Sequence, residues 1–150
     1  MTMTHLAADE IDDIVEMMRE AYEHSPVYAQ LPWDEAKLRS RVQQLIAVQA
    51  GYVDYVPGKG VMLGMIHEHW TGLTQVGSVL MWYVREEFRG GLLGVRLLDR
   101  WHRFCDDSKV VFTYAGDSAG LESSSSLAIL KRRGYVPSAT VMQRRPNNAD

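Results

Sequence analysis

Residues 79–105 constrain the fold more than any other stretch, because patterns typical of a strand, a glycine-rich turn and a helix follow one another there. Residues 79–84 are all apolar or aromatic, which favours a buried strand. A charged turn with three glycines follows. Apolar residues then recur at three- and four-residue spacing, as on the buried face of an amphipathic helix. These residues are Leu97, Leu98, Trp101, Phe104 and Cys105.

The turn has the properties of an anion-binding site. The first N–H groups of a helix have no partner within the helix, and the helix dipole favours negative charge beside them. Gly90, Gly91 and Gly94 would let the main chain approach a phosphate closely, and Arg89 adds a positive charge. The GxxxxGK[ST] and GxGxxG motifs of nucleotide-binding folds are absent. An ordinary strand-to-helix turn would explain the same residues, so the motif alone does not decide.

The turn, residues 89–94, resembles the acyl-CoA signature of the GCN5-related N-acetyltransferases (GNAT), which reads Arg/Gln-x-x-Gly-x-Gly/Ala. Arg89 and Gly94 match this signature, whereas Leu92 stands where the central glycine is usual. The departure is compatible with the motif if residue 92 contributes its backbone N–H. His24-Ser25-Pro26 and Trp82-Tyr83-Val84, together with the turn, resemble small acetyltransferases of phage and prophage origin.

The composition is typical of a globular protein, with 46% hydrophobic and 23% charged residues in a chain of 150. We expect one domain over residues 1–145 and a flexible tail over residues 146–150. The net charge of −3 gives no basic surface, so no direct nucleic-acid binding is expected. Neither a signal peptide nor a membrane-spanning run is recognisable, so we expect a cytoplasmic protein without a membrane partner. Cys105 is expected in the core rather than as a nucleophile.

Hydrophobic periodicity and turn residues predict the element order β-α-α-β-β-β-α-β-α-β. The predicted strands are residues 2–6, 52–56, 61–69, a long strand ending at residue 84, 110–114 and 135–144. The first predicted helix is capped by Asp9 and runs to about His24, and the second is capped by Asp34 and closed by Gly51. The third is the central helix, and the last spans residues 121–133 and ends at Gly134.

This order predicts an α/β fold of mixed type, with helices on both faces of a mixed sheet. It is also the element order of the GNAT family. Residues 127–135 resemble the helix of that family that ends in Gly-Phe/Tyr, here Gly134-Tyr135. The resemblance implies a three-layer α/β/α fold whose mostly antiparallel sheet is splayed at the cofactor site.

The resemblance implies acetyl-CoA as the cofactor. The pantetheine arm would lie between the strand ending at Val84 and the strand at residues 110–114, while backbone N–H groups of the turn would hold the pyrophosphate. The implied cofactor-binding residues are Trp82, Tyr83, Val84, Arg89, Gly90, Gly91, Leu92, Leu93, Gly94, Val95, Ser123 and Ser124. Strand alternation places Trp82 and Tyr83 on opposite faces, so core packing is the alternative for one of them.

Acetyl transfer would proceed by direct attack of an amine, with a backbone N–H at the splay polarising the carbonyl. His67, Glu68 and His69 are candidates for the general base, and alternation points the two histidines to the same side. A solvent-exposed strand end would explain them equally well. A metal site is not expected, because no third ligand stands nearby.

The sequence departs from the family at the residue that usually acts as the general acid. Many family members have a Tyr four residues before the Gly of Gly-Phe/Tyr, and this sequence has Leu130. Water, Tyr114 or Tyr135 would then protonate the thiolate, although both tyrosines could simply pack. Glu23, His24 and Tyr28 stand where the family forms its acceptor pocket, with a capping and packing cluster as the alternative.

The sequence therefore favours an acetyl-CoA-dependent N-acetyltransferase acting on a primary amine. The acceptor could be a small molecule or a protein amine, and a homodimer is compatible with the family. The alternative is a non-catalytic acyl-CoA-binding or protein-interaction module on the same fold, which Leu130 and Leu92 would favour.

Overall fold

The computed structural model describes residues 5–116 and 124–138, and all structural statements below concern these residues. The strands are β1 (Gly51–Val56), β2 (Gly60–Glu68), β3 (Gln75–Val84) and β4 (Phe112–Tyr114). The α-helices are α1 (Ala8–His24), α2 (Glu35–Ala47), α3 (Leu93–Asp107) and α4 (Ser124–Arg132). Two 3-10 turns, η1 (Tyr28–Gln30) and η2 (Glu86–Phe88), precede α2 and α3. No helix among the described residues has the length and apolarity needed to cross a membrane.

The four described strands form one mixed sheet in the order β1-β2-β3-β4. β1 pairs with β2 and β2 with β3 in antiparallel fashion, whereas β3 and β4 are parallel. A tight turn with Gly58 at φ 68° joins β1 to β2, and a longer loop joins β2 to β3. The predicted mixed, mostly antiparallel sheet is confirmed.

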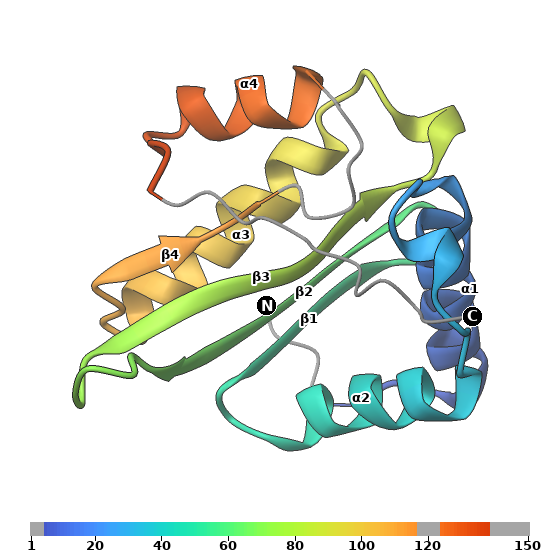
Figure 1. The fold of residues 1–150 in the computed structure, drawn as a ribbon, viewed down its shortest axis with the longest axis horizontal. Coiled ribbons are helices and arrows are strands. Elements are labelled where there is room, and N and C mark those ends of the chain that lie inside the picture. Colours follow the sequence, from blue (N-terminus) through green and yellow to red (C-terminus); the bar gives the residue numbers. More distant parts are fainter. Residues whose placement is uncertain (1–4, 117–123, 139–150) are drawn as a thin grey trace, which may run out of the picture.

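Two hydrophobic cores lie on the two faces of this sheet (Figure 1). The first core joins α1 and α2 to one face, and its strand residues include Val53, Tyr55, Val61 and Leu63. The second core joins α3 and α4 to the other face, and it includes Tyr52, Met62, Leu97, Leu98, Trp101, Cys105 and Leu130. The predicted three-layer arrangement is therefore confirmed.

Trp101 packs against two glycines of the sheet. A Cβ atom built on Gly64 would lie 2.5 Å from the indole ring, and one on Gly77 would lie 2.9 Å from it. Glycine at both positions therefore lets α3 approach β2 and β3 closely. Cys105 lies in the same core, where burial raises the pKa of its thiol to about 12. The prediction that Cys105 is a core residue is confirmed.

The splay between β3 and β4 follows from their short pairing. β4 pairs with β3 only from Val76↔Phe112 to Ser78↔Tyr114, whereas β3 continues through residues 79–84. The described part of the chain provides no strand partner for this continuation on the β4 side. The register between β2 and β3 also skips Leu80, so a β-bulge marks the point where the splay begins.

Both α1 and α2 are capped by acidic side chains. The Ala7 N–H donates to the Glu10 carboxylate at 2.8 Å, so Ala7 and not Asp9 is the N-cap of α1, and the prediction for Asp9 is wrong. The backbone of residue 7 is extended and that of residue 9 is already helical, and an N-cap residue has a non-helical backbone, so the N-cap is residue 7. Asp34 caps α2 by accepting from the Lys37 N–H at 2.9 Å, as predicted.

Several predicted boundaries are wrong. α2 ends at Ala47, and Gly51 instead begins β1, where its missing Cβ avoids a clash with the Leu45 carbonyl. The predicted buried strand 110–114 is the short β4, and Phe112 on it is 61% exposed because β4 is the edge of the described sheet.

The predictions at the two ends of the chain are only partly testable. His5 and Leu6 of the predicted strand 2–6 are not in a strand, and residues 2–4 lie outside the described residues. Residues 135–138 are likewise not in a strand, and residues 139–150, with the rest of that strand and the tail, lie outside. Gly134 follows α4 at φ 86°, which confirms it as the residue that ends this helix.

Candidate cofactor and reaction site

The strand, turn and helix predicted at residues 79–105 are present. β3 ends at Val84, η2 follows, and the chain turns at Gly90, whose φ of 83° lies in the left-handed region that favours glycine. α3 then starts at Leu93. The Trp82 indole N–H donates to the Gly94 carbonyl at 3.1 Å, which ties the strand to the first turn of the helix.

The N-terminus of α3 is open. Its first backbone bond runs from the Arg96 N–H to the Leu92 carbonyl at 2.9 Å, and the N–H groups of residues 90–95 have no partner among the described residues. α3 has no side-chain cap such as Asp34 provides for α2, and, unlike α1 and α2, it has no acidic residue in its first turn. Six consecutive N–H groups and a helix dipole are therefore available to an external anion.

The Leu92 side chain does not fill this turn, because it is 64% exposed. Arg89 donates from Nε to the Val84 carbonyl at 2.8 Å, and its guanidinium lies 5.4 Å from the Tyr83 ring centroid. It forms no ion pair with any described carboxylate, so its charge is available to a ligand. As strand alternation predicts, Trp82 packs on the second core and Tyr83 on the first.

His67 and Tyr114 are brought together around Ser78, at the start of the splay. His67 Nε2 lies 2.9 Å from the Ser78 hydroxyl, and Ser78 is paired with Tyr114 across β3 and β4. Neighbouring strands lie about 4.8 Å apart, so the row formed by His67, Ser78 and Tyr114 across three strands is about 10 Å wide. Alternation puts all three side chains on the sheet face that α1 and α2 pack against, opposite the face that contacts Trp101.

The hydrogen bonds of His67 define which nitrogen is basic. Nδ1 lies 3.1 Å from the Glu68 carbonyl oxygen, which can only accept, so Nδ1 carries the proton. Nε2 then has the lone pair and accepts from the Ser78 hydroxyl. Sequence reasoning missed Ser78, because only the register of β2 against β3 places it beside His67.

The other two candidate bases lie elsewhere. Alternation turns Glu68 to the opposite face from His67, and His69 lies in the β2–β3 loop, where Nδ1 is 2.7 Å from the Thr71 hydroxyl. No group of three metal-ligating side chains occurs in residues 5–116 and 124–138.

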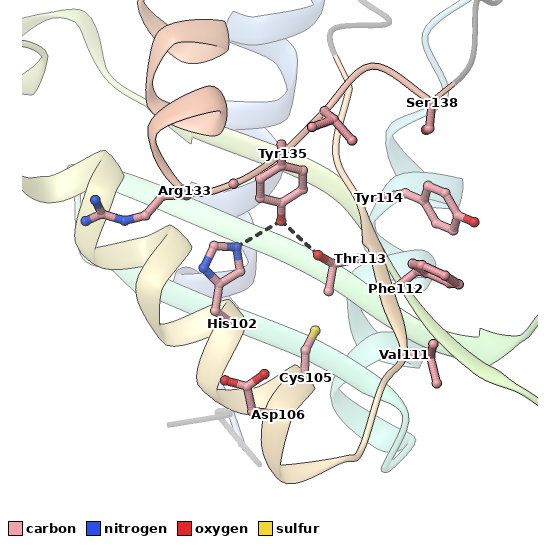
Figure 2. Close-up of a pocket in the computed structure, with 12 residues that line it drawn as sticks. His102, Cys105, Asp106, Val111, Phe112, Thr113, Tyr114, Arg133, Tyr135 and Ser138 are labelled. Carbon is pink, nitrogen blue, oxygen red and sulfur yellow. Dashed lines mark hydrogen bonds between the residues drawn. The ribbon is translucent and has the colours of Figure 1, made fainter.

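A cavity of about 570 Å³ lies beside β4, between α3 and residues 133–138 (Figure 2). In it the Tyr135 hydroxyl lies 2.9 Å from His102 Nε2 and accepts from the Thr113 hydroxyl at 3.2 Å. Burial raises the pKa of Tyr135 and lowers that of His102. Figure 2 shows Tyr114 and Phe112 pointing to the other side of β4 from Tyr135 and Thr113, so the two candidate acids are separated.

Leu130 is buried in the second core, so α4 presents a packed aliphatic side chain where the family usually has Tyr. Ser124 begins α4, and Ser123 lies outside the described residues. The roles predicted for these serines stay predictions.

The residues predicted for the acceptor pocket make local contacts at the end of α1. Glu23 lies 3.7 Å from Arg19, and His24 Nδ1 lies 2.6 Å from the Glu20 carbonyl. The Tyr28 ring stacks on Tyr22 with centroids 6.3 Å apart. These contacts fit the capping and packing alternative, and an acceptor role for these residues stays a prediction.

Arg85 forms a network that sequence reasoning missed. Its guanidinium lies 2.8 Å from Asp13 and 2.9 Å from Glu20, two carboxylates of α1. Tyr55 donates to Asp13 at 2.7 Å, and Tyr83 donates to Glu20 at 3.0 Å. Burial raises the pKa of Asp13, but the hydrogen bonds from Tyr55, Gly58 and Arg85 outweigh it and lower that pKa overall. Burial and the Glu20 carboxylate raise the pKa of Tyr83 to about 12.

No family model and no curated protein matches this sequence. Solved structures do match its fold over nearly the whole chain. A Trypanosoma brucei acetyltransferase has a TM-score of 0.68 at 16% identity, with 94% of this chain and 96% of that one covered. The aminoglycoside 6′-N-acetyltransferase AAC(6′)-Ig from Acinetobacter haemolyticus has a TM-score of 0.67 at 15% identity, with 95% of each chain covered.

A structure of AAC(6′)-Iy in complex with the bisubstrate analogue CoA-S-monomethyl-acetylneamine has a TM-score of 0.69 at 12% identity, with 95% of each chain covered. None of these structures supports the phage-type subgroup, which stays a prediction. The shared architecture is a mixed sheet with helices on both faces. The chain therefore has the GNAT fold, the fold of these acetyltransferases.

Proposed function

We propose that this protein is an acetyl-CoA-dependent N-acetyltransferase that acts on a primary amine. The observation that carries the proposal is the course of β3, which leaves β4 after Ser78 and leads directly to the uncapped N-terminus of α3. Proteins of the same fold are acetyltransferases, and one was solved with a CoA-linked bisubstrate analogue.

The residues present fit an acyl-CoA ligand. The six N–H groups of residues 90–95 would hold its pyrophosphate, assisted by the charge of Arg89. The main chain of Trp82, Tyr83 and Val84 would pair with the pantetheine arm on the side that β4 leaves open. Acetyl-CoA, when bound, supplies an activated thioester.

The reaction centre is proposed at the start of the splay. The backbone N–H of the bulged Leu80 would donate to the carbonyl oxygen of the acetyl group, where negative charge develops. His67 Nε2 would take the proton from the attacking amine, directly or through the Ser78 hydroxyl. As the amine nitrogen bonds to the acetyl carbon, the carbon–sulfur bond breaks, and water or Tyr114 protonates the leaving thiolate.

The test is an amine panel assayed for thiol release from acetyl-CoA, preceded by thermal melts with and without the cofactor. Ligand that binds only the native state raises the melting temperature by mass action, so a shift of several degrees is expected at saturating acetyl-CoA. No shift at millimolar acetyl-CoA would refute the cofactor assignment.

A second function is favoured by one observation. Leu130 is buried where an acidic hydroxyl is usual, which is compatible with a protein that binds acyl-CoA without turning it over. Stabilisation by acetyl-CoA together with no thiol release from any amine in the panel would support this non-catalytic alternative.

A further inference from the structure

The turn between β1 and β2 lies against the segment that leads from β3 into the glycine turn at residues 89–94, although about thirty residues of sequence separate the two turns. The Lys59 carbonyl accepts from the Arg85 N–H at 2.9 Å, and the Lys59 ammonium lies 5.3 Å from the centroid of the Phe88 ring. A Cβ atom built on Gly60 would lie 3.5 Å from Leu93, the first residue of α3. Backbone and side-chain contacts therefore hold Lys59 beside the residues that precede the glycines.

Lys59 and Arg89 have no carboxylate partner among the described residues, whereas half of the described arginines have one. Arg19, Arg39, Arg85, Arg100 and Arg133 each form an ion pair with Asp or Glu. Within the described ranges neither Lys59 nor Arg89 has one, although Glu86 and Glu87 lie on the neighbouring η2. Two uncompensated cations from different elements thus flank Phe88, at the edge of the open N–H groups.

This arrangement distinguishes two kinds of phosphate. Neutral N–H groups at a helix start suit the singly charged phosphates of a pyrophosphate diester. A phosphate monoester carries a charge of about −1.5 to −2 at pH 7 and three strong acceptor oxygens, so it gains more from full positive charges. CoA contains both groups, since its ribose carries a 3′-phosphate in addition to the pyrophosphate.

We propose that Lys59 binds the 3′-phosphate of CoA, beside the pyrophosphate that Arg89 assists, and makes the protein select CoA over dephospho-CoA. This subsite rests on the proposed function, and it adds a residue from outside the strand–turn–helix unit. The cation–π contact with Phe88 restricts the Lys59 side chain near the subsite before the ligand arrives.

The test compares CoA with dephospho-CoA by calorimetry on the wild type and on Lys59→Met. The wild type should bind CoA about tenfold or more tightly than dephospho-CoA, as a charge-assisted contact provides. Lys59→Met should bring this ratio close to one without changing the affinity for dephospho-CoA. Lys59→Arg keeps the charge and should keep most of the ratio, and Lys37→Met, on α2, is the matched control that should change neither affinity.

Three results would overturn the subsite. Equal binding of the two ligands by the wild type would remove it while leaving the proposed function intact. An equal loss of affinity for both ligands in Lys59→Met would show a general effect on the turn instead. Binding of neither ligand by the wild type at millimolar concentration would refute the subsite and the proposed function together. Because Lys59 is exposed, thermal melts of its variants should match the wild type.

Discussion

At the scale of single residues, the contact between Trp101 and the glycines of the sheet gives a test of the second core. Gly64→Ala would place a Cβ 2.5 Å from a buried ring, so the helix or the ring must move. Overpacking of this kind costs about 1–3 kcal/mol. Denaturant unfolding should show this loss for Gly64→Ala and none for Gly72→Ala, where no atom of the described residues lies within 4 Å of the added Cβ.

His67 gives a residue-scale test of the chemistry. His67→Ala should lower turnover about 10²-fold or more, because an ammonium cannot attack the thioester and a general base typically contributes this much. His69→Ala is the matched control, since His69 bonds to Thr71 in the loop outside the sheet. The rise of the rate with pH on the acid side should change only in the His67 variant. A control variant as impaired as His67→Ala would contradict this assignment.

At the scale of elements, α3 differs from the helices on the other face by lacking an acid at its start. Leu92→Asp should stabilise the protein by about 0.3–1 kcal/mol, because a carboxylate is favourable at a helix N-terminus. The same carboxylate would occupy the open N–H groups and repel phosphate, so CoA affinity should fall. Denaturant unfolding and calorimetry on Leu92→Asp and on the neutral Leu92→Asn would separate the effect of the charge from the effect of losing the leucine side chain. A rise in the CoA affinity of Leu92→Asp would contradict the anion site.

At the scale of the whole molecule, the Arg85 network ties α1 to the β1–β2 turn and to the end of β3. Because the folded-state pKa of Asp13 is lowered, its contribution to stability is present above its ordinary value of 3.8 and is lost as the pH falls below it. The free-energy difference between the wild type and Asp13→Asn should therefore be largest near neutral pH and shrink below about pH 4. A pH-independent difference for Asp13→Asn would argue against the ionised network.

The order of the described elements could be predicted from the sequence, because periodicity and turn residues act locally. The stripe of α3, the Asp34 cap and the end of α4 at Gly134 are of this kind. The features that escaped prediction are set by residues distant in sequence. Arg85 meets carboxylates more than sixty residues away, and Ser78 meets His67 only through strand register.

The wrong predictions have the same origin. Asp9 has the chemistry of a cap, but the helix begins two residues earlier because Glu10 reaches back to Ala7. The strand at residues 110–114 is apolar, but its pairing with β3 ends after three residues and leaves Phe112 exposed. For the candidate site, the glycine turn could be recognised from its sequence motif. Its openness follows only from the structure, in which no described residue accepts a hydrogen bond from the N–H groups of residues 90–95.

The splay also leaves a signature in amide hydrogen exchange. In residues 79–84 of β3, backbone amides alternate between the side paired with β2 and the side that β4 leaves. Without ligand, every second amide should exchange rapidly while its neighbours remain protected. Pantetheine in the gap would serve as a surrogate strand, so acetyl-CoA should slow exchange of the unprotected set alone. Uniform protection without ligand would mean that this edge of β3 is already covered.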